Sequence, residues 1–168
     1  MSKLAVISDI HDNIPNLEKA LAIIKKEKVD YLICTGDVQS IEAWKLIDQL
    51  KISTWAVMGN VDHDILGEEE LKKQIKNITL FPNVGVAEIE DKNIIFTHYP
   101  QVLEKALAKS KKYYALALHG HTHKPWEEKW NNTKILCSGN IASIYFMPTF
   151  AIIDTMSLKA QLILLNEK

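Results

Sequence analysis

The 168-residue sequence contains no arginine: all twenty of its basic residues are lysine. Only a guanidinium group offers a rigid pair of parallel N–H donors, so no bidentate clamp for a phosphate or carboxylate group can form within this chain. Any bound anion must be held by cations, histidines, backbone N–H groups or lysine. We favour genome composition as the explanation of the missing arginine, so its absence limits the chemistry of the chain without identifying its function.

Other absences narrow the class of protein. The net charge of −1 provides no overall attraction to nucleic acid or to a membrane surface. No segment approaches the roughly 18 apolar residues that a membrane span requires. An apolar run begins at Lys3, which leaves no room for a signal peptide. Cys34 and Cys137 form no CxxC pair and fit small core residues. A disulfide between them stays open, but we expect a reducing, cytoplasmic location.

Apolar runs alternate with amphipathic segments in the first sixty residues. The pattern predicts strands over 3–8, 31–35 and 52–58, and helices over 16–27 and 40–50. In the first helix the apolar residues recur at helical spacing, and Ser40 is a suitable N-cap for the second. This β-α-β-α-β order favours parallel strands joined by right-handed crossovers.

The pattern then changes from alternating units to a strand-rich second half. We expect a loop over 61–67, helices over 68–76 and 101–110, and strands over 84–90, 93–97, 114–118, 126–130, 134–137, 150–154 and 158–164. Asp91-Lys92 is the expected hairpin turn. No linker or repeat is visible, so residues 1–168 are expected to form a single domain of two packed sheets with outer helices. Trp126 and Trp130 share a strand face that belongs to the core or to a subunit contact, which leaves a homo-oligomer open.

Polar motifs follow the ends of most of the expected strands. They are Asp9-Ile10-His11, Gly36-Asp37, Gly59-Asn60, Thr97-His98 and Gly120-His121-Thr122-His123. Strands of an α/β sheet end along a common edge, so these side chains are expected to converge. In the first and last motifs, residues i and i+2 of an extended chain would face the same side. Carboxylates, an amide and imidazoles suit one or two divalent cations of borderline hardness.

In this order the motifs resemble those of the calcineurin-like metallophosphoesterases, and within them the small, single-domain, phosphodiesterase-like branch. The family pattern D-x-H, G-D, G-N-x-D, His and G-H-x-H is present between residue 4 and about residue 125. The resemblance implies an α/β fold, specifically a four-layer αββα sandwich of two mixed sheets with flanking helices.

The resemblance also implies a dinuclear metal centre. One cation would be held by Asp9, His11, Asp37 and His123, and the other by Asp37, Asn60, His98 and His121, with Asp37 bridging the two. A hydroxide between the cations would attack phosphorus. Nitrogen and oxygen ligands suit Mn²⁺, Fe²⁺, Ni²⁺ or Zn²⁺, of which we favour Mn²⁺.

The chain departs from the family pattern at a few positions. Val61 stands where some relatives carry a histidine that protonates the leaving group, and His63 is either a replacement general acid or a solvated loop histidine. Asp62 matches an acidic position that we expect to orient a ligand histidine. Tyr99 stands where glycine is usual and is expected either to narrow the pocket or to form a substrate-facing wall, whereas His119 is expected to be structural.

The function that follows is hydrolysis of a small phosphodiester, with Asn60, Asp62 and His63 as the candidate catalytic residues. A long nucleic acid is an unlikely substrate, because no basic groove is visible in the sequence. The alternatives are a phosphomonoesterase acting on a small metabolite, an exonuclease, and a non-enzymatic protein-binding scaffold. A retromer subunit of this family is such a scaffold, and its metal site is eroded. Here every expected ligand is present, which favours an enzyme.

Overall fold

The structure is a computed structural model that describes residues 2–65 and 67–165. Strands and helices follow one another in the order β1 (Lys3–Ile7), α1 (Ile14–Lys26), β2 (Tyr31–Cys34), α2 (Ile41–Asp48), β3 (Ser53–Val57), α3 (Asn60–Ile65), α4 (Glu68–Gln74), β4 (Ile78–Phe81), β5 (Val84–Ile89), β6 (Lys92–Thr97), α5 (Pro100–Lys109), β7 (Leu116–His119), β8 (Trp126–Trp130), β9 (Thr133–Cys137), β10 (Thr149–Asp154) and β11 (Ala160–Leu164). No described helix is long and apolar enough to cross a membrane.

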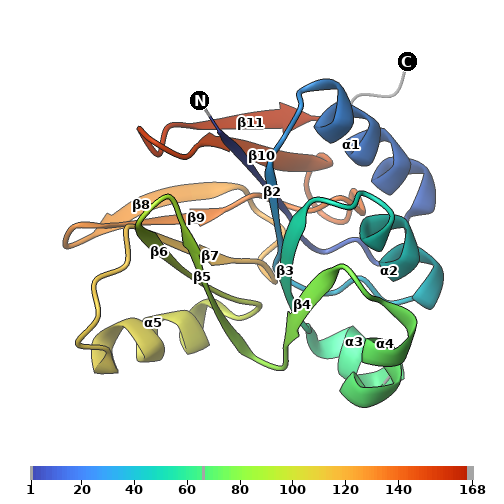
Figure 1. Ribbon diagram of the computed structural model, residues 1–168, viewed down its shortest axis with the longest axis horizontal. Helices are drawn as coiled ribbons and strands as arrows, with labels where there is room; N and C mark the ends of the chain where they lie inside the picture. Colours follow the sequence, from blue (N-terminus) through green and yellow to red (C-terminus); the bar gives the residue numbers. More distant parts are fainter. Residues whose placement is uncertain (1, 66, 166–168) are drawn as a thin grey trace.

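The strands form two mixed sheets that pack face to face (Figure 1). The first sheet has the order β11-β10-β1-β2-β3-β4, in which β1 to β4 are parallel and β10 runs antiparallel to β1. The second has the order β5-β6-β7-β9-β8, with β6, β7 and β9 parallel. Helices α1 and α2 cover the outer face of the first sheet, and α5 covers the second (Figure 1). The expected four-layer sandwich is confirmed.

Apolar residues on both faces of the central strands hold the layers together. In β1, Leu4 and Val6 pack between the sheets, while Ala5 and Ile7 pack toward α1 and α2. This two-sided burial explains why the strand is an uninterrupted apolar run instead of an alternating one. Phe96, fully buried on β6, belongs to the same inter-sheet cluster. The burial fixes where each strand ends, and therefore where the polar residues that follow it are placed.

Side chains cap the first two helices, although only the second cap was expected from the sequence. Asn13 caps α1 by accepting the Asn16 N–H at 3.1 Å, with Pro15 in the first turn. Ser40 caps α2 by accepting the Ala43 N–H at 3.1 Å, as expected. These caps fix the starts of the two helices directly after the loops that follow β1 and β2.

Several local expectations were wrong. Most of the expected loop over 61–67 is the short helix α3, because Asn60 opens a helical turn in which the His63 N–H reaches the Gly59 carbonyl at 3.4 Å. Strand β4 was not expected, since its four residues carry too short an alternating pattern to stand out from a loop. The hairpin turn lies at Glu90-Asp91, whose φ values of 48° and 62° are left-handed, and Lys92 already pairs with Ile89.

The structure narrows two of the alternatives that the sequence leaves open, for the cysteines and for the tryptophans. Cys34 and Cys137 are both buried free thiols, so the described chain contains no disulfide between them. Trp126 and Trp130 are 52% and 40% exposed on β8, which excludes the core for both. Strand β8 is the edge of the second sheet, so a subunit contact remains a prediction.

Candidate metal centre

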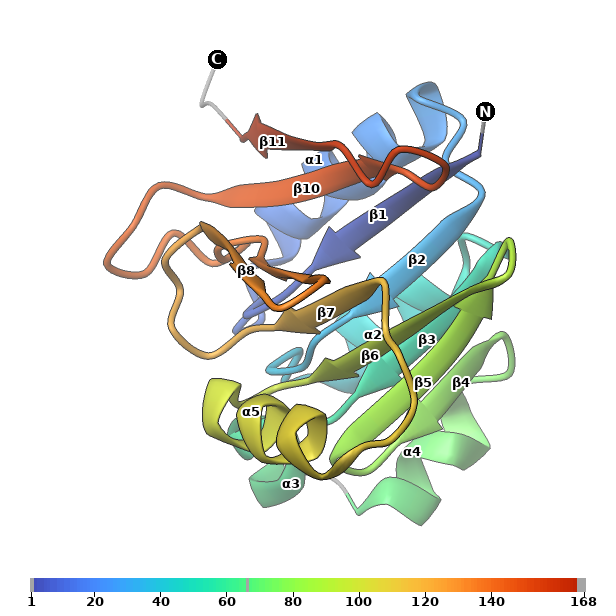
Figure 2. The same ribbon diagram turned by 90° about the vertical axis from the view of Figure 1, so that its left-hand side faces the viewer.

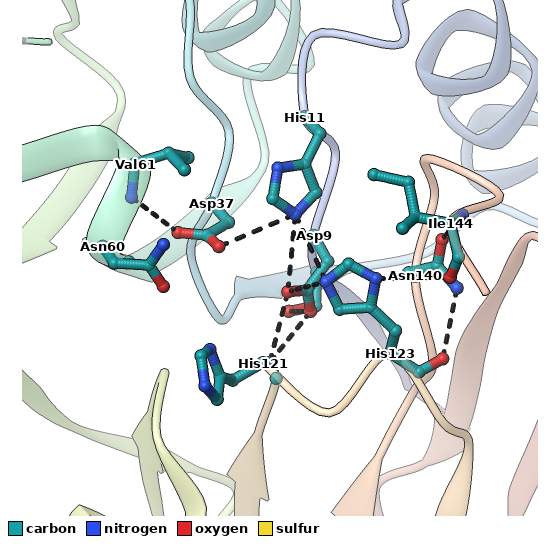
Figure 3. A network of polar contacts seen from close by, with 12 residues as sticks. Asp9, His11, Asp37, Asn60, Val61, His121, His123, Asn140 and Ile144 are labelled. Atoms are coloured by element: carbon teal, nitrogen blue, oxygen red, sulfur yellow. Dashed lines mark hydrogen bonds and ion pairs between the residues drawn. The ribbon is translucent and has the colours of Figure 1, made fainter. Parts of the chain in front are cut away.

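The carboxyl ends of strands from both sheets bring the seven expected ligand residues together. Figure 3 labels all of them except His98. Asp9 and His11 follow β1, Asp37 follows β2, Asn60 follows β3, His98 follows β6, and His121 and His123 follow β7. The candidate ligands therefore converge as the sequence predicts. They come from the strand ends of two sheets, and not from one edge of a single sheet.

Asp9, His11 and His123 form the first group of candidate ligands. One donor atom from each of them lies within 4.8 Å of the others. His123 Nε2 is 3.2 Å from Asp9 Oδ1 and 3.3 Å from His11 Nε2. Figure 3 shows both imidazole rings pointing toward the Asp9 carboxylate.

Asp37, His98 and His121 form the second group, again with donor atoms within 4.8 Å of one another. His98 Nε2 is 3.3 Å from Asp37 Oδ2 and 3.2 Å from His121 Nδ1. The amide oxygen of Asn60 is 3.3 Å from the same His98 nitrogen. Asn60 therefore faces this group and not the first.

One oxygen of Asp37 lies between the two groups. Asp37 Oδ2 is 3.3 Å from His98 Nε2 and 3.6 Å from His11 Nε2. Its other oxygen accepts the Val61 N–H at 3.1 Å, which fixes the carboxylate plane. This is the position that a carboxylate shared by two cations would need.

The hydrogen bonds of two histidines aim ring lone pairs into the groups. His98 Nδ1 is 2.8 Å from the Thr35 carbonyl, and His123 Nδ1 is 3.3 Å from the Ile144 carbonyl. A carbonyl only accepts, so in each ring Nδ1 carries the proton and the neutral ring leaves Nε2 with a lone pair. That lone pair faces other acceptors. A proton on Nε2 can be shared with only one of the facing oxygen or nitrogen atoms. A cation at the centre of the group can bind the lone pairs of all of them, so these residues fit a bound divalent metal ion.

Ionisation of the site follows from the same contacts. Burial opposes the charge on Asp37, but the hydrogen bond and charge of His98 outweigh it, and the pKa of Asp37 lies below its usual value. Burial likewise acts to lower the pKa of His98, but Asp37 outweighs it and the pKa is raised. The hydrogen bond with Asp9 raises the pKa of His123, whereas burial lowers that of His121. Asp37 is thus held ionised, which favours cation binding.

Most of these residues have left-handed backbone. The φ values are 52° at Asp9, 44° at His11, 56° at Asp37, 66° at His121 and 58° at His123. The expectation of extended D-x-H and H-x-H segments was therefore wrong. Non-glycine residues adopt this conformation uncommonly, and at functional sites the surrounding structure holds it in place. Here it sends His121 and His123 to different ligand groups, which two extended residues at i and i+2 would not do.

Glycines make the close approach of these loops feasible. A Cβ at Gly59 would lie 2.0 Å from Asp37 Oδ1, and one at Gly120 would lie 2.1 Å from Ser8 Oγ. Gly36 has a left-handed backbone, with φ of 97°, which a residue with a side chain rarely adopts. At Gly59 the requirement is space for the ligand carboxylate instead of a turn.

Asp62 joins the loops that follow β2 and β3. It is buried, and its Oδ2 accepts the N–H groups of Asp37 and Gly59, both at 2.8 Å. Its Oδ1 accepts the N–H groups of Val38 and Gln39 at 2.9 and 2.8 Å. Burial outweighs these bonds and raises the pKa of the carboxyl. Asp62 therefore contacts backbone in the described structure, where we expected it to orient a ligand histidine.

The remaining residues singled out in the sequence lie around the site. The Tyr99 ring packs edge-on against His98 and His121, with ring centroids 4.9 and 4.7 Å away. It therefore occupies space directly beside the second group of candidate ligands. His63 is exposed on α3, three residues after Asn60. His119 is buried, with Nδ1 3.0 Å from the Gly120 carbonyl, as expected for a structural histidine.

Sequence reasoning missed the residues that fix His123. The buried Asn140 donates from Nδ2 to the His123 carbonyl at 3.1 Å and accepts the Ile144 N–H at 2.9 Å (Figure 3). Ile144 in turn receives the His123 ring hydrogen bond. The only signal was the polar Ser138-Gly139-Asn140 segment after an apolar run, to which no role could be given without a structure.

We expect Asp62→Asn to lower the free energy of unfolding by about 2–4 kcal/mol, because either orientation of the amide leaves two backbone N–H groups without an acceptor. Urea denaturation in the presence of EDTA measures this without a contribution from bound cations. Asp91→Asn, in the exposed β5–β6 turn, is the matched control, with an expected change below about 0.5 kcal/mol. Equal stability of the two variants would contradict the role of Asp62.

Comparisons with known proteins agree on one family. Residues 2–157 match the profile of the calcineurin-like phosphoesterase superfamily domain. Phosphodiesterase MJ0936 of Methanocaldococcus jannaschii is 30% identical over 159 residues, which span 91% of this chain and 93% of that protein. A solved structure of a novel archaeal phosphodiesterase matches with a TM-score of 0.83 and 29% identity, covering 97% of this chain and 99% of the other.

Another solved structure, vacuolar protein sorting 29 from Cryptosporidium parvum, has a TM-score of 0.70 at 20% identity, covering 98% of this chain and 96% of the other. At this identity the likeness shows the fold alone. The profile match, in contrast, extends over most of the sequence and includes every motif that supplies a candidate ligand. The chain belongs to the calcineurin-like phosphoesterase superfamily.

Proposed function

We propose that the protein is a dinuclear metal-dependent phosphodiesterase that hydrolyses a small phosphodiester. The observation that carries the proposal is the single Asp37 oxygen lying between two compact groups of ligand atoms. The phosphodiesterase named among its relatives supports hydrolysis of a diester over a monoester. Hydrolysis of a small phosphomonoester is the closest alternative, because the same groups can bind either anion.

The ligands divide as the family pattern implies. Asp9, His11 and His123 would hold one cation, and His98, His121 and Asn60 the other, with Asp37 shared. Mn²⁺ is our preferred cation, although Fe²⁺, Ni²⁺ and Zn²⁺ suit the same donors. When bound, such a pair binds phosphoryl oxygens and acidifies a water that can attack phosphorus.

The residues of the chain determine how an anionic substrate is attracted. The carboxylates of Asp9 and Asp37 neutralise only half of the charge of two divalent cations, so the loaded site is positive. This replaces the arginine clamp that the chain lacks. His121 is exposed, which leaves the second group open to solvent and substrate beside Tyr99.

The same features argue against the other candidates. A net charge of −1 provides no overall attraction to a polymeric nucleic acid, so a small ester is the better substrate. A purely protein-binding role would not require seven side chains that can bind metal to be held with their donor atoms close to one another. Their backbone strain and shared orientation favour an enzyme.

We expect the Mn²⁺-loaded protein to hydrolyse bis(p-nitrophenyl) phosphate, and His121→Ala to abolish this activity because the second group loses a ligand. Elemental analysis should find the metal content falling from two ions to about one per chain. Thr122→Ala, in the same turn but with its side chain near Lys124 and Cys137, should keep both. Hydrolysis that persists in His121→Ala would overturn the proposal.

We further propose that His63 protonates the leaving group, since it lies about one helical turn after Asn60 on α3. A general acid matters only when the leaving group is strongly basic. His63→Asn should therefore slow release of phenol from a phenyl diester about 100-fold, while release of the weakly basic p-nitrophenolate changes by less than about threefold. Steady-state rates on the two substrates measure this, with Glu69→Gln on α4 as control. Equal rate losses on both substrates would assign His63 another role.

A further inference from the structure

The segment between β9 and β10 is tied to the metal centre and to helix α1 by asparagine side chains. Asn140 bonds the His123 carbonyl and the Ile144 N–H at 3.1 and 2.9 Å. On the other side, Asn13 Nδ2 donates to the Ala142 carbonyl at 3.1 Å, and Asn16 Nδ2 donates to the Ile141 carbonyl at 3.0 Å. This loop is therefore held from both sides.

The loop presents Tyr145 to solvent at the margin of the first ligand group. Tyr145 is 91% exposed, and its ring centroid lies 6.0 Å from that of His123, with the planes tilted by 49°. Its φ of 62° is left-handed, as is that of Ser143 at 63°. A bulky residue in this conformation is an outlier, and its ring buries almost nothing in return. The packing of the chain itself therefore gives no reason for an aromatic ring at this position.

We propose that Tyr145 is a stacking platform for a planar aromatic group on the substrate, so that the site takes aryl or nucleoside phosphate esters. The inference rests on the proposed phosphoesterase function. Loaded cations would hold the phosphate, but they provide no contact for the organic part of the ester. The solvent-facing Tyr145 ring beside His123, carried on a loop whose backbone is held by asparagine hydrogen bonds, provides one.

The neighbouring surface supports an apolar partner. Phe146 and Met147, which follow Tyr145, are 41% and 61% exposed. Tyr99 contacts His98 and His121, so each ligand group has a tyrosine ring beside it. Because the chain has no arginine, stacking on a guanidinium plane is excluded, and aromatic side chains are left for that role. A methyl ester would gain little from such a surface.

Competitive inhibition of bis(p-nitrophenyl) phosphate hydrolysis by phenyl phosphate, thymidine 5′-monophosphate and methyl phosphate tests the proposal. In the Mn²⁺-loaded wild type, an aromatic ester should inhibit about three- to tenfold more strongly than methyl phosphate. Tyr145→Ala should reduce this advantage to less than about twofold, whereas Tyr145→Phe should keep it. Tyr113→Ala, which removes another exposed ring, is the matched control.

The two aromatic inhibitors distinguish which part of a substrate stacks on Tyr145. An advantage for phenyl phosphate assigns the platform to a ring attached directly to the phosphate, and an advantage for thymidine monophosphate alone assigns it to a nucleobase. Either result, if lost in Tyr145→Ala, supports the proposal. Equal inhibition by all three compounds, or an advantage that survives in Tyr145→Ala, overturns it.

Calorimetry keeps this test separate from the proposed function. If wild-type protein hydrolyses no phosphodiester, the proposed activity fails, but binding of the same three compounds to the Mn²⁺-loaded protein can still be titrated. Active wild-type protein with no aromatic preference would leave the phosphodiesterase in place and remove only the role of Tyr145.

Discussion

Repulsion between facing lone pairs is the constraint on which the candidate site depends. His98 Nε2 lies at hydrogen-bond distance from His121 Nδ1, from Asp37 Oδ2 and from the Asn60 amide oxygen, although most of these atoms are acceptors. Such an arrangement is costly unless positive charge lies at its centre. Because the strand ends are fixed by a core that is apolar on both faces, the fold can impose this arrangement before any cation binds.

The contacts that hold the site are directed mainly at backbone. Asp62 ties together the turns after β2 and β3, the Thr35 carbonyl orients His98, and Asn140 fixes the turn of His123. Backbone partners are insensitive to side-chain motion, so they keep the ligand atoms within the narrow tolerance that metal coordination demands. The left-handed backbone of five candidate ligands is the cost of this arrangement.

The sequence predicted which residues meet but not how they do so. Apolar runs placed Asp9, Asp37 and His98 at strand ends correctly, because burial controls both the runs and their ends. The backbone conformation of His121 and His123 could not be predicted, since the neighbouring Gly120 indicates a turn without indicating that the histidines themselves are left-handed. The bonds of Asp62 and the exposure of Tyr145 were equally hidden, because both depend on loops distant in sequence that only the folded chain brings together.

Anomalous X-ray diffraction from crystals grown with Mn²⁺ tests the central claim most directly. The account predicts two manganese peaks about 3.5–4 Å apart, with Asp37 touching both, His11 and His123 on one side, and His98 and His121 on the other. A single peak, or two peaks that share no ligand, would contradict it.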